Sequence, residues 1–161
     1  MPDGLRPLDL IKTAEDLVVA SNGRPRQTNL RRAVSTAYYA MFHSLARSCA
    51  NLLIGGPGSG RSRGAWNQVY RALEHGAAKS ACQNQAKLAL FPQQIQDFAN
   101  AFVAMQTKRH LADYDPREIF YKSDTLLQLE VASVVIDGFE AAPLKDRRAF
   151  AAFVLFKART N

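Results

Sequence analysis

An arginine occupies a position where the apolar pattern of its segment predicts a core residue. The helical spacing on this face is set by four apolar side chains: Ile95, Phe98, Phe102 and Met105. Arg109 continues the same face about three turns beyond Phe98. A guanidinium that points inward needs an anionic partner, because an unpaired buried charge costs several kcal/mol. Asp113, one turn further on, provides a carboxylate for an internal ion pair; the alternative is that Arg109 holds the phosphate of a ligand.

A second stripe of polar and aromatic residues is expected on an earlier helix. Arg32, Tyr39 and His43 lie within about 20° of one another around the helix axis, and Thr36 completes the stripe. A guanidinium, a phenol and an imidazole in line can bind a nucleotide by charge, by stacking and by proton exchange. The alternative interpretation is a boundary between core and solvent, with the rings packed and their polar ends hydrated.

The chain has 161 residues and a formal net charge of +7, and its basic residues are unevenly distributed. No acidic residue lies between Asp16 and Glu74, whereas eight arginines do: Arg24, Arg26, Arg31, Arg32, Arg47, Arg61, Arg63 and Arg71. Guanidinium groups match phosphate oxygens two at a time, so this stretch favours a polyanionic partner, with Arg61 and Arg63 on an electrostatic approach surface. A solvated helix face followed by a basic loop is the alternative.

The elements that must position these side chains are helices. Alanine and leucine dominate, apolar residues recur every three or four positions, and no sustained alternation predicts strands. We expect an all-α fold, an antiparallel bundle of four to five main helices plus a short C-terminal helix, in a single domain over residues 1–161 with its core over residues 8–140. The expected helices cover residues 8–20, 30–52, 65–80, 92–115, 124–139 and 143–159. Thr28 or Asn29 is expected to cap the N-terminus of the second helix, and Ser123 or Asp124 that of the fifth.

Two segments between these helices, and one helix face, complete the expected architecture. Residues 55–64 are rich in glycine and arginine and are expected to form a flexible loop, and residues 81–91 are expected to form a connector. The helix over residues 124–139 is expected to bury one apolar face, which consists of Leu126, Leu127, Val131, Val134, Val135 and Phe139.

Several functional classes lack their motifs. Residues 55–62 (GGPGSGRS) are similar to a phosphate-binding loop with arginine in place of lysine, but they follow a helix instead of a strand, which argues against an NTPase. Cys49 falls in the expected core and Cys82 in a connector, and no zinc motif or nucleophile elbow occurs, so we expect no metal and no cofactor. Because neither a signal peptide nor a membrane span is visible, we expect a cytoplasmic protein.

Two separated motifs resemble the small bacterial proteins of the HEPN superfamily (higher eukaryotes and prokaryotes nucleotide-binding). Residues 31–43 read RRAVSTAYYAMFH, and residues 109–115 read RHLADYD. The resemblance implies an antiparallel helical bundle, often a homodimer, with a polar groove between the helices that carry the motifs. Many members are metal-independent endoribonucleases of toxin–antitoxin or antiviral systems, whereas others pair with a minimal nucleotidyltransferase or have lost activity.

The chain departs from the ribonuclease members in one respect. Those members share an arginine followed by four to six residues and a histidine, and here Asp113 stands near the position of that histidine. None of His43, His75 and His110 has an arginine at the required distance upstream. This difference matters because metal-free RNA cleavage needs an acid and a base near neutrality, for which imidazole is better suited than a carboxylate paired with arginine.

Residues and resemblance together predict three alternative functions. The first is a non-catalytic or weakly catalytic RNA- or nucleotide-binding module of a defence or toxin–antitoxin system; its binding residues would be Arg32, Tyr39, Arg61, Arg63, Arg109 and Tyr114. The second is an active metal-independent endoribonuclease that uses Arg109, Asp113 and His43. The third is a protein-interaction subunit that pairs with a minimal nucleotidyltransferase. A homodimer is expected in each case, from the resemblance alone.

Overall fold

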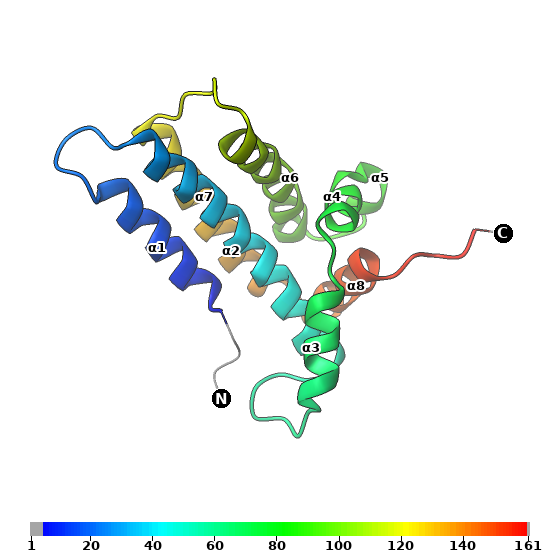
Figure 1. Ribbon diagram of the computed structural model, residues 1–161. Helices are drawn as coiled ribbons and strands as arrows, with labels where there is room; N and C mark the ends of the chain where they lie inside the picture. Colours follow the sequence, from blue (N-terminus) through cyan, green and yellow to red (C-terminus); the bar gives the residue numbers. More distant parts are fainter. Residues whose placement is uncertain (1–4, 161) are drawn as a thin grey trace.

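In the computed structural model, which describes residues 5–160, the chain forms an all-α bundle, as predicted (Figure 1). No strand occurs among these residues. The helices follow one another along the chain as α1 (Pro7–Val19), α2 (Gln27–Leu53), α3 (Arg63–Ala72), α4 (His75–Gln83), α5 (Gln85–Leu88), α6 (Gln93–Tyr114), α7 (Lys122–Glu140) and α8 (Leu144–Leu155). None of the described helices is long and apolar enough to cross a membrane.

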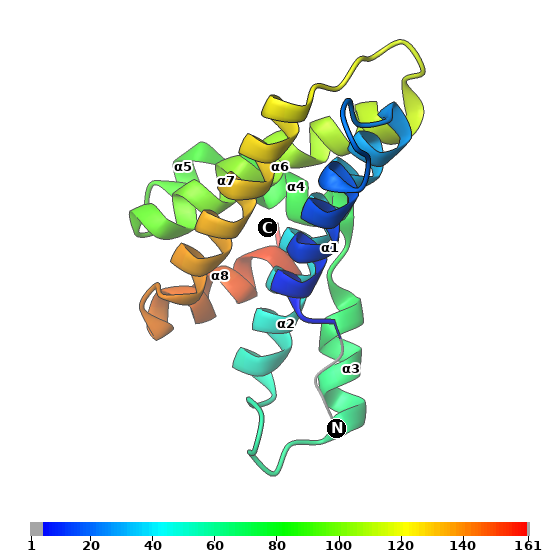
Figure 2. The same cartoon turned by 90° about the vertical axis from the view of Figure 1, so that its left-hand side faces the viewer.

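The long helix α2 is the centre of the bundle. It packs against α1, α6 and α7 along its length and against α3 and α8 near its C-terminal end, as Figures 1 and 2 show from two sides. Burial on several sides explains why α2 is apolar or small at so many positions, including Leu30, Val34, Met41 and Leu45. One buried residue of α2, Tyr38, is fully shielded from solvent and faces α6, where its ring contacts Arg109. The core therefore places aromatic side chains of α2 directly against α6.

The helix expected over residues 65–80 is two helices, α3 and α4. The backbone is extended at Leu73 and Glu74, and the Leu73 side chain is buried in the core. No proline lies at this break, and the nearest glycine, Gly76, falls within the first turn of α4, so tertiary packing of Leu73 fixes where the chain turns. Because α3 packs on α2 and α4 packs on α6, the break redirects the chain and starts α4 at His75. The connector expected over residues 81–91 contains the end of α4 and the short helix α5.

Helix boundaries differ from the expected ones by a few residues at several ends, among them the starts of α2 and α7 and the end of α8. Helix α2 begins at Gln27, ahead of Thr28 and Asn29, and its N-cap residue Arg26 makes no side-chain capping bond. The Gln27 amide instead joins this end of α2 to Phe120: Nε2 donates to the Phe120 carbonyl at 2.7 Å, and Oε1 accepts from the Phe120 N–H at 2.9 Å. Helix α7 begins at Lys122, and its N-cap residue Tyr121 makes no side-chain capping bond. Helix α8 ends at Leu155 and not at residue 159.

The buried face of α7 is a correction to the sequence analysis. The structure buries Leu129, Ala132, Ile136 and Phe139, whereas four of the six residues expected inside are exposed: Leu126, Leu127, Val131 and Val134. Apolar residues lie on nearly all sides of this helix, so periodicity alone did not define one inner face. Packing against α1, α2 and α6 selects the face that is buried.

Candidate functional site

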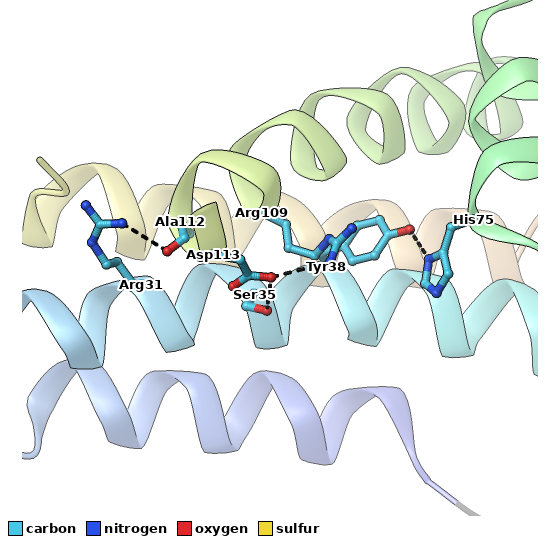
Figure 3. A network of polar contacts seen from close by, with 7 residues as sticks. All are labelled: Arg31, Ser35, Tyr38, His75, Arg109, Ala112 and Asp113. Carbon is cyan, nitrogen blue, oxygen red and sulfur yellow. Dashed lines mark hydrogen bonds and ion pairs between the residues drawn. The ribbon is translucent and has the colours of Figure 1, made fainter. Parts of the chain in front are cut away.

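Arg109 lies where α6 crosses α2, beside Tyr38 (Figure 3), and it also contacts Tyr39. Its Cζ atom is 4.9 Å from the ring centroid of Tyr38 and 5.7 Å from that of Tyr39. Nη1 donates to Asp113 Oδ2 at 3.3 Å, and the two side chains are 14% and 30% exposed. The predicted ion pair is therefore present, and cation–π contact with both rings adds to it. Arg109 Nε is nevertheless buried without a hydrogen-bond partner among the described residues, so the internal contacts do not satisfy every donor.

The side chain of Arg31 fixes the end of α6 beside this cluster. Its Nη1 donates to the carbonyl oxygens of Leu111, Ala112 and Asp115 at 3.4, 3.0 and 2.7 Å, and its Nη2 donates to the carbonyl of Glu118. The last carbonyls of a helix have no partner within the helix, and a cation beside them also favours the helix dipole. Arg31 on α2 therefore caps α6 within a turn of Asp113.

A histidine that the sequence analysis did not assign joins the cluster from α4. The Tyr38 hydroxyl lies 2.6 Å from His75 Nδ1 (Figure 3). The His75 ring also stacks on Phe42, with ring centroids 3.9 Å apart. Burial, together with the positive charge of Arg109, lowers the pKa of His75 below its usual value. Burial also raises the pKa of Tyr38 far above the usual range. Near neutral pH the pair is therefore an uncharged imidazole and a protonated phenol.

His43 forms a second tyrosine–histidine pair on the next turn of α2. Its Nδ1 lies 2.5 Å from the hydroxyl of Tyr70, which α3 supplies. Burial lowers the pKa of His43 and raises that of Tyr70. His43 is thus neutral at pH 7 and is held against α3, one turn of α2 away from Tyr39.

These contacts form a continuous series of rings, which we call the aromatic path: Trp66, Tyr70, His43 and Tyr39. Successive ring centroids are 5.1, 5.8 and 6.3 Å apart. An arginine lies at each end, because Arg61 Cζ is 4.8 Å from the Trp66 ring and Arg109 Cζ is 5.7 Å from the Tyr39 ring. All members except Trp66 are partly exposed. The path joins the glycine-rich loop to the Arg109 cluster, which the sequence analysis treated as separate features.

Arg61 is also a structural element of its loop. Its Nη1 donates to Asn51 Oδ1 at 3.1 Å and to the Gly55 carbonyl at 2.9 Å, while Trp66 Nε1 donates to the same Asn51 oxygen at 2.8 Å. Gly55 has a φ of 142°, which an L side chain rarely adopts, so the loop needs glycine where it leaves α2. Residues 55–62 are irregular, and Arg61 connects them to both flanking helices. The loop expected over residues 55–64 is shorter than predicted, because α3 begins at Arg63, where the Ser62 side chain caps the helix by accepting from the Ala65 N–H.

Three predicted binding residues lie outside this cluster. Arg32 and Arg63 are exposed, and Tyr114 is exposed with its ring against His110, 4.9 Å between centroids. Arg32 precedes Ser35 by one turn on α2, and Ser35 Oγ is 3.4 Å from Asp113 Oδ2. Of the predicted residues, the structure brings together Arg109, Asp113, Tyr39 and His43, and it connects Arg61 to them through the aromatic path.

A pocket of about 380 Å³ opens beside Arg109 on the side of α4. Its lining residues are Lys79, Gln106, Thr107, Arg109, His110 and Leu111. A larger pocket, of about 730 Å³, lies between α1, the C-terminal half of α2 and α8, and it contains none of the predicted site residues. Within residues 5–160, no three histidine, cysteine, aspartate or glutamate side chains lie close enough to hold a metal ion.

Comparisons of the chain with models of known protein families, with curated proteins and with solved structures gave no match.

Proposed function

We propose that this chain is a HEPN-like protein that binds RNA or a nucleotide phosphate where α2 meets α6, as a non-catalytic or weakly catalytic module of a defence or toxin–antitoxin system. The observation that carries the proposal is the aromatic path with a guanidinium at each end. Proteins that hold single-stranded nucleic acid combine stacking side chains for the bases with positive charge for the backbone. The path offers both features within one surface.

Arg109 is the residue best placed to contact a phosphate. Asp113 engages one of its terminal amino groups, and the buried Nε has no partner among the described residues. A phosphate accepts two parallel hydrogen bonds from one guanidinium. The rings of Tyr38 and Tyr39 hold the guanidinium plane in position, which lowers the entropy lost on binding.

The charge distribution supports the same interpretation. The acid-free stretch between Asp16 and Glu74 includes α2, the glycine-rich loop and α3, the elements that carry the aromatic path. Neutralising phosphates with such a surface releases condensed counterions, so binding must weaken steeply as salt is added.

The test is fluorescence anisotropy with a short, end-labelled single-stranded RNA over a series of salt concentrations. The double variant Arg109→Ala/Asp113→Ala keeps the net charge and is expected to bind at least tenfold more weakly, since it removes a charge-assisted contact. Tyr39→Leu is also expected to weaken binding. Two controls, Arg148→Ala on α8 and Tyr121→Leu before α7, alter exposed residues outside the path and are expected to bind within twofold of wild type. A flat salt dependence, or equal losses in variants and controls, would refute the proposal.

A metal-independent endoribonuclease is the second candidate, and the position of His75 favours it. The ring of Tyr38 contacts Arg109 on its face and the His75 imidazole through its hydroxyl. A neutral imidazole can take the proton of a 2′-hydroxyl, and Arg109 can stabilise the charge of the phosphorane that forms. His75 thus fits the role of acid or base better than His43, because the tyrosine paired with His75 also contacts Arg109, whereas the tyrosine paired with His43 belongs to α3.

Cleavage is tested by incubating end-labelled structured RNA with the protein in EDTA and analysing the fragment ends. A ribonuclease of this kind leaves 2′,3′-cyclic phosphates, and both Arg109→Ala and His75→Ala are expected to abolish the products. Arg148→Ala, an exposed position on α8 that does not line the pocket beside Arg109, is the control and is expected to leave the products unchanged. Intact RNA that is nevertheless shifted on a gel would refute the ribonuclease and support the binding module.

A further inference from the structure

Two buried polar atoms of α6 have no hydrogen-bond partner among the described residues, and their residues line the same pocket. They are Arg109 Nε and Gln106 Oε1. Buried polar atoms in folded proteins are nearly always paired, and these two orphans, whose residues line one pocket of about 380 Å³, are groups that a ligand in the pocket would pair. Lys79 reaches the pocket from α4 and adds a second cation.

The orientation of the Gln106 amide is fixed by its neighbour. Its Nε2 lies 3.5 Å from the carbonyl oxygen of His75, at the limit of a hydrogen bond. The reversed amide would place two acceptors against each other, so the donor end must face His75. Gln106 is 9% exposed as a residue, and its buried Oε1 is left as an acceptor without a donor among the described residues. A ligand in the pocket would therefore supply a hydrogen-bond donor to Gln106 Oε1 and an acceptor to Arg109 Nε.

The spacing of these two residues restricts how far apart the matching groups of the ligand can be. Gln106 and Arg109 are three residues apart on one helix, so their side chains are neighbours. A matching ligand carries a hydrogen-bond donor immediately beside an anion. In RNA, the 2′-hydroxyl and the 3′-phosphate are attached to adjacent carbons of one ribose, whereas DNA keeps the phosphate and lacks the donor.

We propose that Gln106 accepts a hydrogen bond from the 2′-hydroxyl of the nucleotide whose phosphate Arg109 holds, and so gives the protein its preference for RNA over DNA. This inference rests on the function proposed above, because it assumes that Arg109 binds a nucleic-acid phosphate. It adds a specificity-determining residue outside both resemblance motifs, since Gln106 lies upstream of residues 109–115.

The experiment compares three single strands of one sequence by fluorescence anisotropy: RNA, 2′-fluoro RNA and DNA with uracil in place of thymine. The 2′-fluoro strand keeps the sugar pucker of RNA and cannot donate a hydrogen bond. Wild type is expected to bind RNA about three- to tenfold more tightly than either other strand, the range for one net hydrogen bond. Gln106→Met keeps the side-chain length and is expected to bind all three equally. Gln94→Met, an exposed position on the first turn of α6, is the matched control and is expected to keep the preference.

The outcomes separate the two proposals. If wild type binds 2′-fluoro RNA as tightly as RNA, or if Gln106→Met keeps the preference, the role of Gln106 is refuted while RNA binding stands. If wild type binds none of the strands, the proposed function is refuted and this inference with it. The 2′-fluoro comparison uses wild-type protein, so it decides the question even if Gln106→Met does not fold.

Discussion

Arg31 Nη1 lies 2.7 Å from the carbonyl oxygen of Asp115, so a side chain of α2 holds the residue that directly follows α6. The same guanidinium contacts three further carbonyls and lies over the Phe120 ring, 5.4 Å from its centroid. The turn of α6 that carries Arg109 and Asp113 is therefore fixed relative to α2 by a residue outside the candidate site. Position 31 belongs to the first of the two motifs, and its role in this structure is to position α6.

Arg31→Met is expected to destabilise the protein by about 2–3 kcal/mol, because several carbonyls at the end of α6 lose their donor together. The measurement is the free energy of unfolding from urea titrations followed by circular dichroism. Arg32→Met removes the same charge from the neighbouring, exposed position and is expected to change stability by less than about 0.5 kcal/mol. Equal losses at positions 31 and 32 would show that the carbonyl contacts contribute little.

The pair of Arg109 and Asp113 is expected to give a coupling free energy of about 1 kcal/mol in a double-mutant cycle of Arg109→Ala and Asp113→Ala. Both side chains are mostly shielded, so each single change leaves its partner with an unmatched charge. Arg109→Ala alone is therefore expected to lower the melting temperature more than the double change does. Additive effects of the two single changes would contradict this, and would show that solvent screens the pair.

The sequence sufficed for features that depend on local spacing. The helical class, the core positions of α2 and the pairing of Arg109 with Asp113 all follow from repeats of three or four residues, which define one face of a helix. Helix α7 shows where this reasoning fails, since apolar residues surround it and only its neighbours decide which face is buried.

The role of His75 could not be predicted from the sequence. It reaches Tyr38 because the chain breaks at Leu73 and Glu74, where neither glycine nor proline signals an end, and because α4 then packs on α6. Contacts between segments that are distant in the sequence, such as α2 and α4, depend on tertiary packing and do not produce a periodic pattern in the sequence. The same holds for Arg61, which the sequence presents as a loop charge and the structure places on Trp66.

Arg61→Met is expected to speed backbone hydrogen exchange over residues 55–62. The change removes hydrogen bonds to Asn51 and to the Gly55 carbonyl, together with the contact on Trp66, so the loop loses its connection to α2 and α3. Hydrogen exchange followed by mass spectrometry measures this directly. Arg63→Met, at the exposed first residue of α3, is the matched control and is expected to leave the rates unchanged. Unchanged exchange in both variants would mean that the loop is held by its other contacts.

The pH dependence of stability is expected to reflect two half-buried histidines, His75 and His43. The pKa values of His75 and His43 are lower in the folded protein than the usual 6.5, because burial disfavours the charged imidazole and because Arg109 adds repulsion at His75. Below pH 6.5 the histidines of the unfolded chain therefore bind more protons than those of the folded protein. The free energy of unfolding must fall as the pH drops through 6.5 toward the folded-state pKa values. Above pH 6.5 this contribution to stability is retained. His75→Gln keeps an acceptor for the Tyr38 hydroxyl and is expected to reduce the pH dependence of the free energy of unfolding. The double variant His75→Gln/His43→Gln is expected to reduce it further. Urea titrations at intervals between pH 5 and pH 7.5 test this, and an unchanged slope in the double variant would assign the dependence to other groups.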